Sequence, residues 1–516
     1  MRQRRTPAST VPIEFTIRAL PSLPAASWIA MVAAGRVSVV CGRRVDAHAR
    51  GVFEGVWDGP FEAFDCDRAE NVFGSGMRLR DGRIVFVSPS HTLEGLYVHQ
   101  EGDRLVISNS LAFLLEHEGI EVPRDQPLCR RLSTSVLGMQ RYERVLFSSG
   151  RGVVSRVLNA TLEVDDEGTR VRPRASTARF EHFESYASHV RQVLRRVVEN
   201  GRAREGRRGF ELMTTVSSGY DSAACAALAT ALGCREALTL QTGRSGRSDS
   251  GAAVAEALQL TLHAYDAGEA ESVGIAQEFF GSGMGGEDLP FAAFEPHLGD
   301  TMLLTGFHGD KLWEYSVQPN DQLIRGDISG SSLIEFRLRV GFVVVPVPFI
   351  GALRHEEICR ITHSDEMQAF RVGGAYDRPI ARRIAEEAGV PRDAFGQRKE
   401  MVSVLAFMRL GLLPPVVREC LRRYVRTHAS LRDHVADRWW YTRSLVWRVA
   451  RRIAVRARMP RLVPKIERAI LGGDWRVFEH SAPLSSELVF RWALAGVRAR
   501  YRVIDAEAHD EDLERG

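Results

Sequence analysis

Apolar and polar positions follow different periods in successive parts of the chain. In the first third, short apolar runs are separated by glycine, aspartate and other turn-forming residues, which indicates strands joined by tight turns. The charged, proline-containing stretch 169–178 that follows is predicted to be a linker. Residues 1–165 are therefore expected to form a strand-rich domain, with strands at 83–87, 95–98, 104–107, 144–147 and 152–157 and a helix at 110–117.

A helical period begins at Phe183 and then gives way to alternating strands and helices. Phe183, Tyr186, Val190, Val193 and Val197 have helical spacing. Strands are predicted at 210–216, 237–241, 262–265 and 301–305, with helices beginning at 223 and 250. Such alternation is typical of an α/β fold with a parallel, doubly wound sheet. We expect this domain to cover 180–410 and a helical region to cover 411–516.

Composition limits the class of protein and its compartment. Of 516 residues, 44% are hydrophobic and 26% charged, as in soluble globular proteins, and the net charge of +4 does not imply a nucleic-acid partner. The seven cysteines are scattered and never form a C-x-x-C pair, which favours a reducing cytoplasm over a disulfide framework or a zinc site. Arg36 interrupts the first apolar stretch and the run 341–353 is short, so no membrane span is predicted.

Small polar residues fill one strand-to-helix turn, Ser217-Ser218-Gly219-Tyr220-Asp221-Ser222. In open parallel sheets, ligands bind beyond the carboxyl ends of the strands, where free N–H groups at a helix start attract phosphate. Asp221 would repel phosphate unless a cation such as Mg²⁺ lies between them. Alternatively, Ser and Asp simply cap the helix, and this string leaves both interpretations open. It is neither a Walker A loop nor G-x-G-x-x-G.

This turn resembles the S-G-G-x-D-S pyrophosphate loop of the ATP pyrophosphatase superfamily, as found in asparagine synthetases, with Ser218 in place of the first glycine. Three later segments follow in that family's order. Residues 305–312 (TGFHGDKL) resemble T/S-G-E-G-A/S-D-E-L, residues 347–351 resemble V-P-F-L-D, and the stretch 378–400 is similar to one that ends in R-x-K-E. The resemblance covers about 180–410; the N-terminal part resembles the glutaminase half more weakly, best at 105–110.

The resemblance implies a fold and a set of site residues. The expected fold is an ATP-pyrophosphatase domain preceded by a degenerate glutaminase-like domain and followed by a helical tail. ATP would be split between its α and β phosphates to give an acyl-adenylate. The resemblance implies an ATP and pyrophosphate site at Ser217, Ser218, Gly219, Tyr220, Asp221, Ser222, Leu240, Thr305 and Gly306, Mg²⁺ ligands at Asp221 and Asp310, and catalytic roles for Asp310 and Lys399.

Lys399 has a second reason to be singled out. Only three of the 69 basic residues are lysine, at 311, 399 and 465. Lysine offers a compact point charge that arginine cannot replace, so a lysine retained in such a chain suggests a role. For Lys311 a surface position is favoured, because the family has an acid there.

Several positions depart from the family pattern. Phe307 stands where the family has glutamate and Gly351 where it has aspartate, which puts aspartate as the substrate in doubt. The tyrosine and acid that activate an amine in β-lactam synthetase-like relatives are absent too, so a base must come from elsewhere; His308 is one candidate, although a lone loop histidine more often only donates a hydrogen bond. Glutaminase activity needs an N-terminal cysteine, and the first cysteine is Cys41. A structural or docking role is expected for the N-terminal domain.

The C-terminal region is basic and aromatic. Residues 418–468 hold fifteen Arg or Lys against four acids, with Trp439, Trp440, Tyr441 and Trp447 among them. A nucleic-acid patch or a membrane-surface helix would fit. We favour a helical subdomain whose aromatics pack inward and whose arginines are solvated. An acidic substrate would also suit this surface.

Together these features predict an ATP-dependent, AMP-forming amide ligase of the asparagine synthetase type. It would join a small-molecule or peptide carboxylate to ammonia or an amine, without glutaminase activity of its own. A cyclase that closes an intramolecular amide, similar to lasso-peptide cyclases, is the close alternative. A non-catalytic partner protein that retains the fold is the other. A cytoplasmic protein with no nucleic-acid partner is expected, and a homodimer is its candidate assembly.

Overall fold

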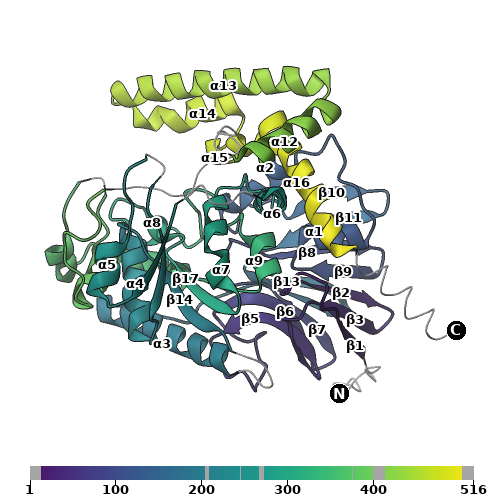
Figure 1. Cartoon of the computed structure of the whole chain (residues 1–516), viewed down its shortest axis with the longest axis horizontal. Helices are drawn as coiled ribbons and strands as arrows, with labels where there is room; N and C mark the ends of the chain where they lie inside the picture. The colour runs from purple at the N-terminus through teal and green to yellow at the C-terminus, as the bar shows by residue number, and fades with distance from the viewer. Residues whose placement is uncertain are drawn as a thin grey trace, which may run out of the picture.

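The computed structural model describes residues 13–203, 209–243, 246–266, 272–374, 376–398 and 413–502. The N-terminal part is built from two sheets, the middle from one parallel sheet between helices, and the C-terminal part from helices (Figure 1). The expected α/β class, with a parallel sheet and a helical C-terminal region, is confirmed at this level.

The first sheet has seven strands and the second has six. They share one buried core, in which Trp28 of one sheet stacks on Phe86 of the other at 6.3 Å between ring centroids. In sheet order, the strands of the first are β1 (Glu14–Ala19), β3 (Arg36–Cys41), β2 (Trp28–Ala33), β9 (Arg104–Ser108), β8 (Leu96–Glu101), β11 (Gly152–Val157) and β10 (Val145–Ser149). Those of the second are β13 (Gly168–Pro173), β12 (Ala160–Asp165), β7 (Arg83–Val87), β6 (Val72–Arg80), β5 (Gly51–Trp57) and β4 (Asp46–His48).

The predicted linker at 169–178 is wrong over its first half. Residues 168–173 form β13, which pairs antiparallel with β12. β13 is an edge strand, and edge strands carry charged residues and proline because these discourage pairing with another chain. The prediction failed because an edge strand and a linker share the same content of charged residues and proline. The five strands and the helix predicted in 83–157 are all present, the helix as α1 (Leu111–His117).

The central sheet has five parallel strands, in the order β16 (Thr261–Tyr265), β15 (Glu236–Leu240), β14 (Glu211–Thr215), β17 (Thr301–Thr305) and β18 (Val343–Pro346). Its side chains alternate between two cores: Met302 and Leu304 face one, and Leu303 faces the other. The first core lies under α3 (Phe183–Arg202), α4 (Tyr220–Ala231) and α11 (Pro379–Glu387). The second lies under α6 (Val273–Gly281), α9 (Ile334–Val340) and α16 (Val489–Arg498). The sheet is thus covered on both faces, as the alternation predicted.

Beyond the gap at 399–412, the described C-terminal residues are helical. α12 (Pro415–His428) leads into the long α13 (Leu431–Arg456), which lies side by side with α14 (Val463–Leu471) along the upper side of the molecule (Figure 1). Trp440 and Trp447 of α13 are buried, whereas Trp439 and Tyr441 are exposed. The prediction that the aromatics pack inward is therefore correct for only two of these four. Within the described parts of the chain, no helix combines the length and the hydropathy that crossing a bilayer requires.

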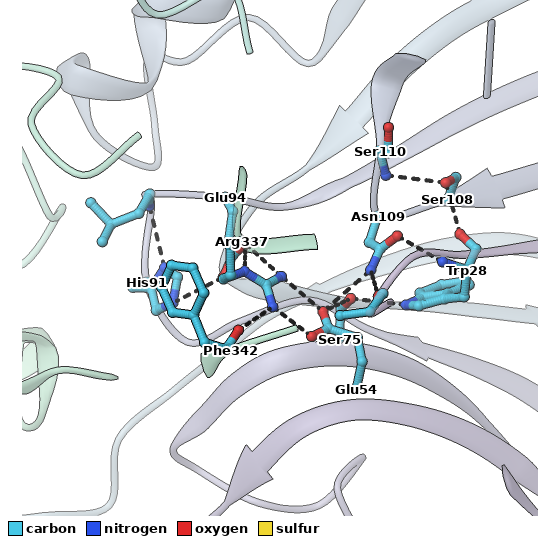
Figure 2. A network of polar contacts seen from close by, with 12 residues as sticks. Trp28, Glu54, Ser75, His91, Glu94, Ser108, Asn109, Ser110, Arg337 and Phe342 are labelled. Carbon is cyan, nitrogen blue, oxygen red and sulfur yellow. Dashed lines mark hydrogen bonds and ion pairs between the residues drawn. The ribbon is translucent and has the colours of Figure 1, made fainter. Parts of the chain in front are cut away.

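A buried ion-pair network joins the N-terminal sheets to the central domain. Arg337 of α9 donates to both carboxylate oxygens of Glu54 in β5, at 2.7 and 3.0 Å, and to Glu94 at 3.0 Å. Figure 2 shows the guanidinium between these two acids, with Ser75 and Asn109 completing the shell of Glu54. Arg337 is only 2% exposed. The two parts of the chain are therefore held together by charges that water does not reach.

Candidate functional site

The order of the central sheet places a cavity at its middle. From β14 the chain proceeds to β15 and β16 on one side, then returns to β17 and β18 on the other, so β14 and β17 flank the point where the strand order reverses. Loops at such a point diverge to opposite faces and leave a crevice at the carboxyl ends of the strands. A cavity of about 230 Å³ lies there, lined by residues of the turn 217–222 and of the loop 305–310.

The turn after β14 is closed by its own side chains. Ser222 Oγ accepts from the Ser217 amide at 3.1 Å and lies 2.8 Å from Ser217 Oγ, which accepts from the Gly219 amide at 3.1 Å. The Ser218 amide donates to the Asp249 carbonyl at 3.2 Å. The expectation that these amides are free is therefore wrong for all three. The small polar residues hold the turn in shape before any ligand arrives.

Helix capping does not account for the turn either. The N-cap of α4 is Gly219, which has no side chain to cap with, and its backbone is extended. The hydroxyl of Ser218 donates to Asp249 at 2.6 Å, outside the described lining of the cavity. The Tyr220 ring is buried, and its hydroxyl accepts from Arg382 at 2.7 Å. Of the predicted turn residues, Ser217, Gly219, Tyr220, Asp221 and Ser222 line the cavity.

Asp221 stands in the first turn of α4 and forms a partly buried ion pair that the sequence did not predict. Its Oδ2 accepts a short hydrogen bond from Arg378 Nη1, and Arg378 Nε donates to Glu314 at 3.1 Å. Asp221 Oδ1 is buried and has no hydrogen-bond partner among the described residues. Burial raises the pKa of Asp221 to about 6, the Arg378 guanidinium opposes that rise, and the Asp310 carboxylate adds to it. Asp221 and Asp310, the two predicted metal ligands, are thus close enough for their charges to repel each other.

Two glycines, at 306 and 309, allow the loop 305–310 to pack directly against Asp221. A Cβ at Gly306 would lie 2.7 Å from Asp221 Cβ, and one at Gly309 would lie 2.5 Å from Asp221 Oδ1. A side chain at 309 would displace the carboxylate, and one at 306 would press on the Cβ and the backbone of Asp221. Asp310 follows in the short α8 (Gly309–Leu312), where Lys311 Nζ is 3.9 Å from its Oδ2. Loop 305–310 and turn 217–222 therefore share one carboxylate-rich floor.

One wall of the cavity is apolar. Leu240, predicted to line the nucleotide, is buried at the end of β15 beside Leu238. Phe291 packs edge-to-face on Phe294 at 5.2 Å, and 5.8 Å from Phe307. Phe291 and Phe294 belong to η2 (Leu289–Phe294), a short 3-10 helix without a period that sequence could reveal. Phe307, at the position where the motif resemblance led us to expect a glutamate, extends this wall.

The remaining predicted residues are distributed as follows. Thr305 ends β17 and Gly306 follows it, both in the cavity lining. His308 has a left-handed backbone, with φ at 78°, and stacks on Phe349 at 4.6 Å. Burial holds its pKa well below the ordinary value, so it stays neutral. Gly351 lies against Phe180, outside the described lining of the cavity. Lys399 lies outside the described residues.

The donor set fits a hard divalent cation. Carboxylate oxygens are the ligands that Mg²⁺ prefers, and Asp221 Oδ1 is a buried oxygen with no hydrogen-bond partner among the residues described. Asp310 lies near enough to raise the pKa of Asp221, a repulsion that a cation between them would relieve. Arg378 occupies Oδ2, so Oδ1 is the oxygen left for a metal.

The N-terminal domain offers its cysteines no access to a substrate. Cys41, Cys66 and Cys129 are all buried. Burial raises the pKa of the Cys66 and Cys129 thiols, which keeps them protonated and poor nucleophiles.

Comparisons with known proteins find little. No family model matches the chain, and no curated protein matches it. Among solved structures, the chain is similar to one described as the allosteric regulatory enzyme of purine biosynthesis, with 9% identity over 57% of this chain and 71% of that one, at a TM-score of 0.17. So low a score supports no statement about function.

Proposed function

We propose that this protein is an ATP-dependent amide ligase that releases AMP and pyrophosphate and joins an activated carboxylate to ammonia or an amine. The observation that carries the proposal is that one cavity is lined by the turn 217–222, Asp310 and Arg378 on one side and by an aromatic wall on the other. A nucleotide needs both halves: an apolar slot for its base and a charged floor for its phosphates. The motif order along 217–400 adds the reaction class.

Different residues of the cavity would bind the phosphates, the metal ion and the base. The turn 217–222, which its own hydrogen bonds hold in shape, would line the phosphate side of the cavity with Gly219 at its tip. Arg378 would balance the charge of Asp221 while keeping its Oδ2 fixed. Asp221 and Asp310 would hold Mg²⁺, which when bound neutralises charge on the phosphates. Leu240, Phe291 and Phe294 would exclude water from the base.

The amine side of the reaction has no assigned base. His308 is neutral, which suits a base, but its ring is stacked on Phe349. With the cysteines of the N-terminal domain buried, ammonia or an amine would come from solution or from the substrate itself. In the second case the product is an intramolecular amide, as in the cyclase alternative.

Nucleotide binding and the bond that is cleaved test the proposal. We expect α,β-methylene-ATP to bind one site per chain in the presence of Mg²⁺, by calorimetry, and ATP and pyrophosphate to compete for it. With ATP, hydroxylamine and a panel of carboxylic acids, the products should be AMP, pyrophosphate and a hydroxamate. Release of ADP and phosphate, or the absence of saturable binding, would contradict the proposal. Binding without AMP formation would favour the non-catalytic alternative.

The metal carboxylates offer a second test. Asp221→Asn and Asp310→Asn keep the shape but remove charge from the cavity floor. We expect each to slow AMP release by at least about a hundredfold, the scale of losing one strong electrostatic contact. Asp365→Asn, an exposed carboxylate in a short 3-10 helix away from the cavity, is the matched control. Normal rates in both site variants would leave the turn with a structural role only.

Lys399 is proposed to stabilise charge that develops during the transfer. Its benefit would then exist mainly in the transition state, so Lys399→Arg should lower kcat with little change in KM for ATP. Arginine spreads its charge over a planar fork, and a site built for a point charge should reject it. Equal kcat values for the variant and the wild type would remove Lys399 from the active site.

A further inference from the structure

Two histidines and a glutamate meet on the face of the central sheet that carries α7 (Glu295–Leu298). Glu236 is the first residue of β15, and His263 lies on the neighbouring edge strand β16. His263 is opposite Leu238 in register, so it is a diagonal neighbour of Glu236 on the same face. His297 reaches them from α7. One ligand atom from each of the three side chains lies within 4.8 Å of the others.

The spacing suits a shared ion. His263 Nε2 and Glu236 Oε2 are 3.2 Å apart. The ring centroids of His263 and His297 lie 4.0 Å apart, with an angle of 33° between the ring planes. Two ligands bound at about 2.0–2.1 Å to one tetrahedral ion are separated by about 3.3 Å. The first pair is therefore already at the separation that coordination requires.

A tyrosine stands behind one of the histidines. Tyr265 Oη lies 2.7 Å from His297 Nε2. Histidines that bind metals usually engage their second ring nitrogen with an outer partner, which fixes the tautomer and the ring orientation. If Nε2–H donates to Tyr265, Nδ1 carries the free electron pair. Tyr265 also packs edge-to-face on Phe294 at 5.9 Å, and Phe294 is part of the apolar wall of the cavity.

We infer that Glu236, His263 and His297 bind one divalent transition-metal ion of the Zn²⁺ type. Imidazole favours such ions over Mg²⁺ or Ca²⁺, which prefer oxygen ligands. The ion ties α7 to β15 and β16. Since α7 directly follows η2, it also fixes the segment that carries Phe291 and Phe294. The site is therefore a structural clamp on the cavity wall, and its existence does not depend on the proposed ligase activity.

Spectroscopy with Co²⁺ tests the inference on the full chain, prepared without a histidine tag and treated with a chelator. We expect one Co²⁺ per chain, with visible absorption bands of a tetrahedral or five-coordinate ion, displaced by Zn²⁺. His263→Ala and His297→Ala should each weaken Zn²⁺ binding by about a hundredfold, and Tyr265→Phe by about tenfold, as loss of an outer partner does. His434→Ala, an exposed histidine on α13, should bind like the wild type.

Hydrogen exchange separates a clamp from a simple hydrogen-bonded cluster. Saturating Zn²⁺ should slow amide exchange in 289–298 of the wild type and leave the His297→Ala variant unchanged. Two results would overturn the inference: Co²⁺ without ligand-field bands of the expected intensity, or Zn²⁺ affinity that is equal in the wild type and both histidine variants. Either would mean that Glu236 merely shares a hydrogen bond with His263, beside which His297 packs.

Discussion

Gly309 and the Asp221 carboxylate are packed against each other at the floor of the cavity. A methyl group at 309 would lie within 2.5 Å of the Asp221 carboxylate, so the helix α8 can approach only because residue 309 has no side chain. The carboxylate cannot retreat easily, since Arg378 holds its other oxygen. At the scale of single residues, the geometry of the site therefore depends on the missing side chain of Gly309 as well as on the carboxylates of Asp221 and Asp310.

Gly309→Ala should consequently disable the site. We expect AMP release to fall at least about tenfold, and the free energy of unfolding to fall by about 1–3 kcal/mol, the range for overpacking a well-filled interior. Gly299→Ala is the control, because a Cβ there meets no atom within 4 Å. Rates and melting curves of the two variants measure the effect. Similar behaviour of both would show that Asp221 can move without consequence.

The raised pKa of Asp221 gives the site a pH signature. Only the ionised carboxylate can hold a cation, so kcat/KM for ATP should fall as the pH drops through about 6 rather than about 4. Stability has the opposite sign: a carboxyl whose pKa is higher in the folded protein stabilises at low pH, and that contribution is lost as the pH rises from about 4 to about 6. Asp221→Asn should thus gain melting temperature relative to the wild type between pH 4.5 and 7.5. A difference that is constant with pH would contradict this.

At the scale of elements, α13 differs from an ordinary surface helix because it is apolar on two opposite sides. Trp440, Trp447 and Ala454 are buried toward α14 and the body of the molecule, and Trp440 Nε1 donates to the Phe478 carbonyl at 2.9 Å. On the other side, large apolar side chains are exposed at Leu431, Val435, Trp439, Val446, Val449 and Ile453. A capping box at Ser430 and Asp433 starts the helix independently of either side.

The two sides predict different outcomes for one substitution. Trp447→Ala removes a side chain that is 6% exposed and should lower the free energy of unfolding by about 3–5 kcal/mol. Trp439→Ala removes one that is 63% exposed and should change it by no more than about 0.5 kcal/mol. Denaturant titrations of the two variants compare them directly. Equal losses would mean that the exposed stripe of α13 is covered in solution.

At the scale of the whole molecule, the ion pairs of Arg337 with Glu54 and Glu94 connect the N-terminal sheets to the central domain (Figure 2). Replacing one member of a buried ion pair leaves the other charge without compensation. Burial already raises the pKa of Glu94 against the opposing effect of Arg337. Removing Arg337 therefore isolates acids that water cannot solvate.

Arg337→Met should lower the free energy of unfolding by about 3–5 kcal/mol and separate the melting of the two parts in calorimetry. Arg36→Met removes an ion pair with Glu14 in which both side chains are mostly exposed, and should change stability little. Adding Glu54→Gln and Glu94→Gln to Arg337→Met should recover part of the loss. A single unchanged transition in Arg337→Met would show that this connection depends on apolar packing instead.

Local patterns predicted much of this protein correctly. Alternating strand and helix periods identified the parallel sheet, because side-chain period depends on neighbours a few residues apart. The turn 217–222 was located at the end of β14 for the same reason, since its composition is incompatible with a strand or a helix interior. Where local pattern was ambiguous the prediction was wrong, as at 168–173, where charge and proline suit both a linker and an edge strand.

Sequence patterns were thus sufficient for the strands and helices of the central sheet, their order and the positions of the motif residues, because each depends on neighbours a few residues apart. Contacts between side chains that are distant along the chain depended on the three-dimensional fold. Arg378 and Asp221 are 157 residues apart in the chain, and Glu236, His263 and His297 come from three different elements. These encounters depend on the strand order of the sheet and on the packing of helices over its two faces, which no local period encodes. The ion pair on the cavity floor, the aromatic wall and the two-sided burial of α13 all arise at that level.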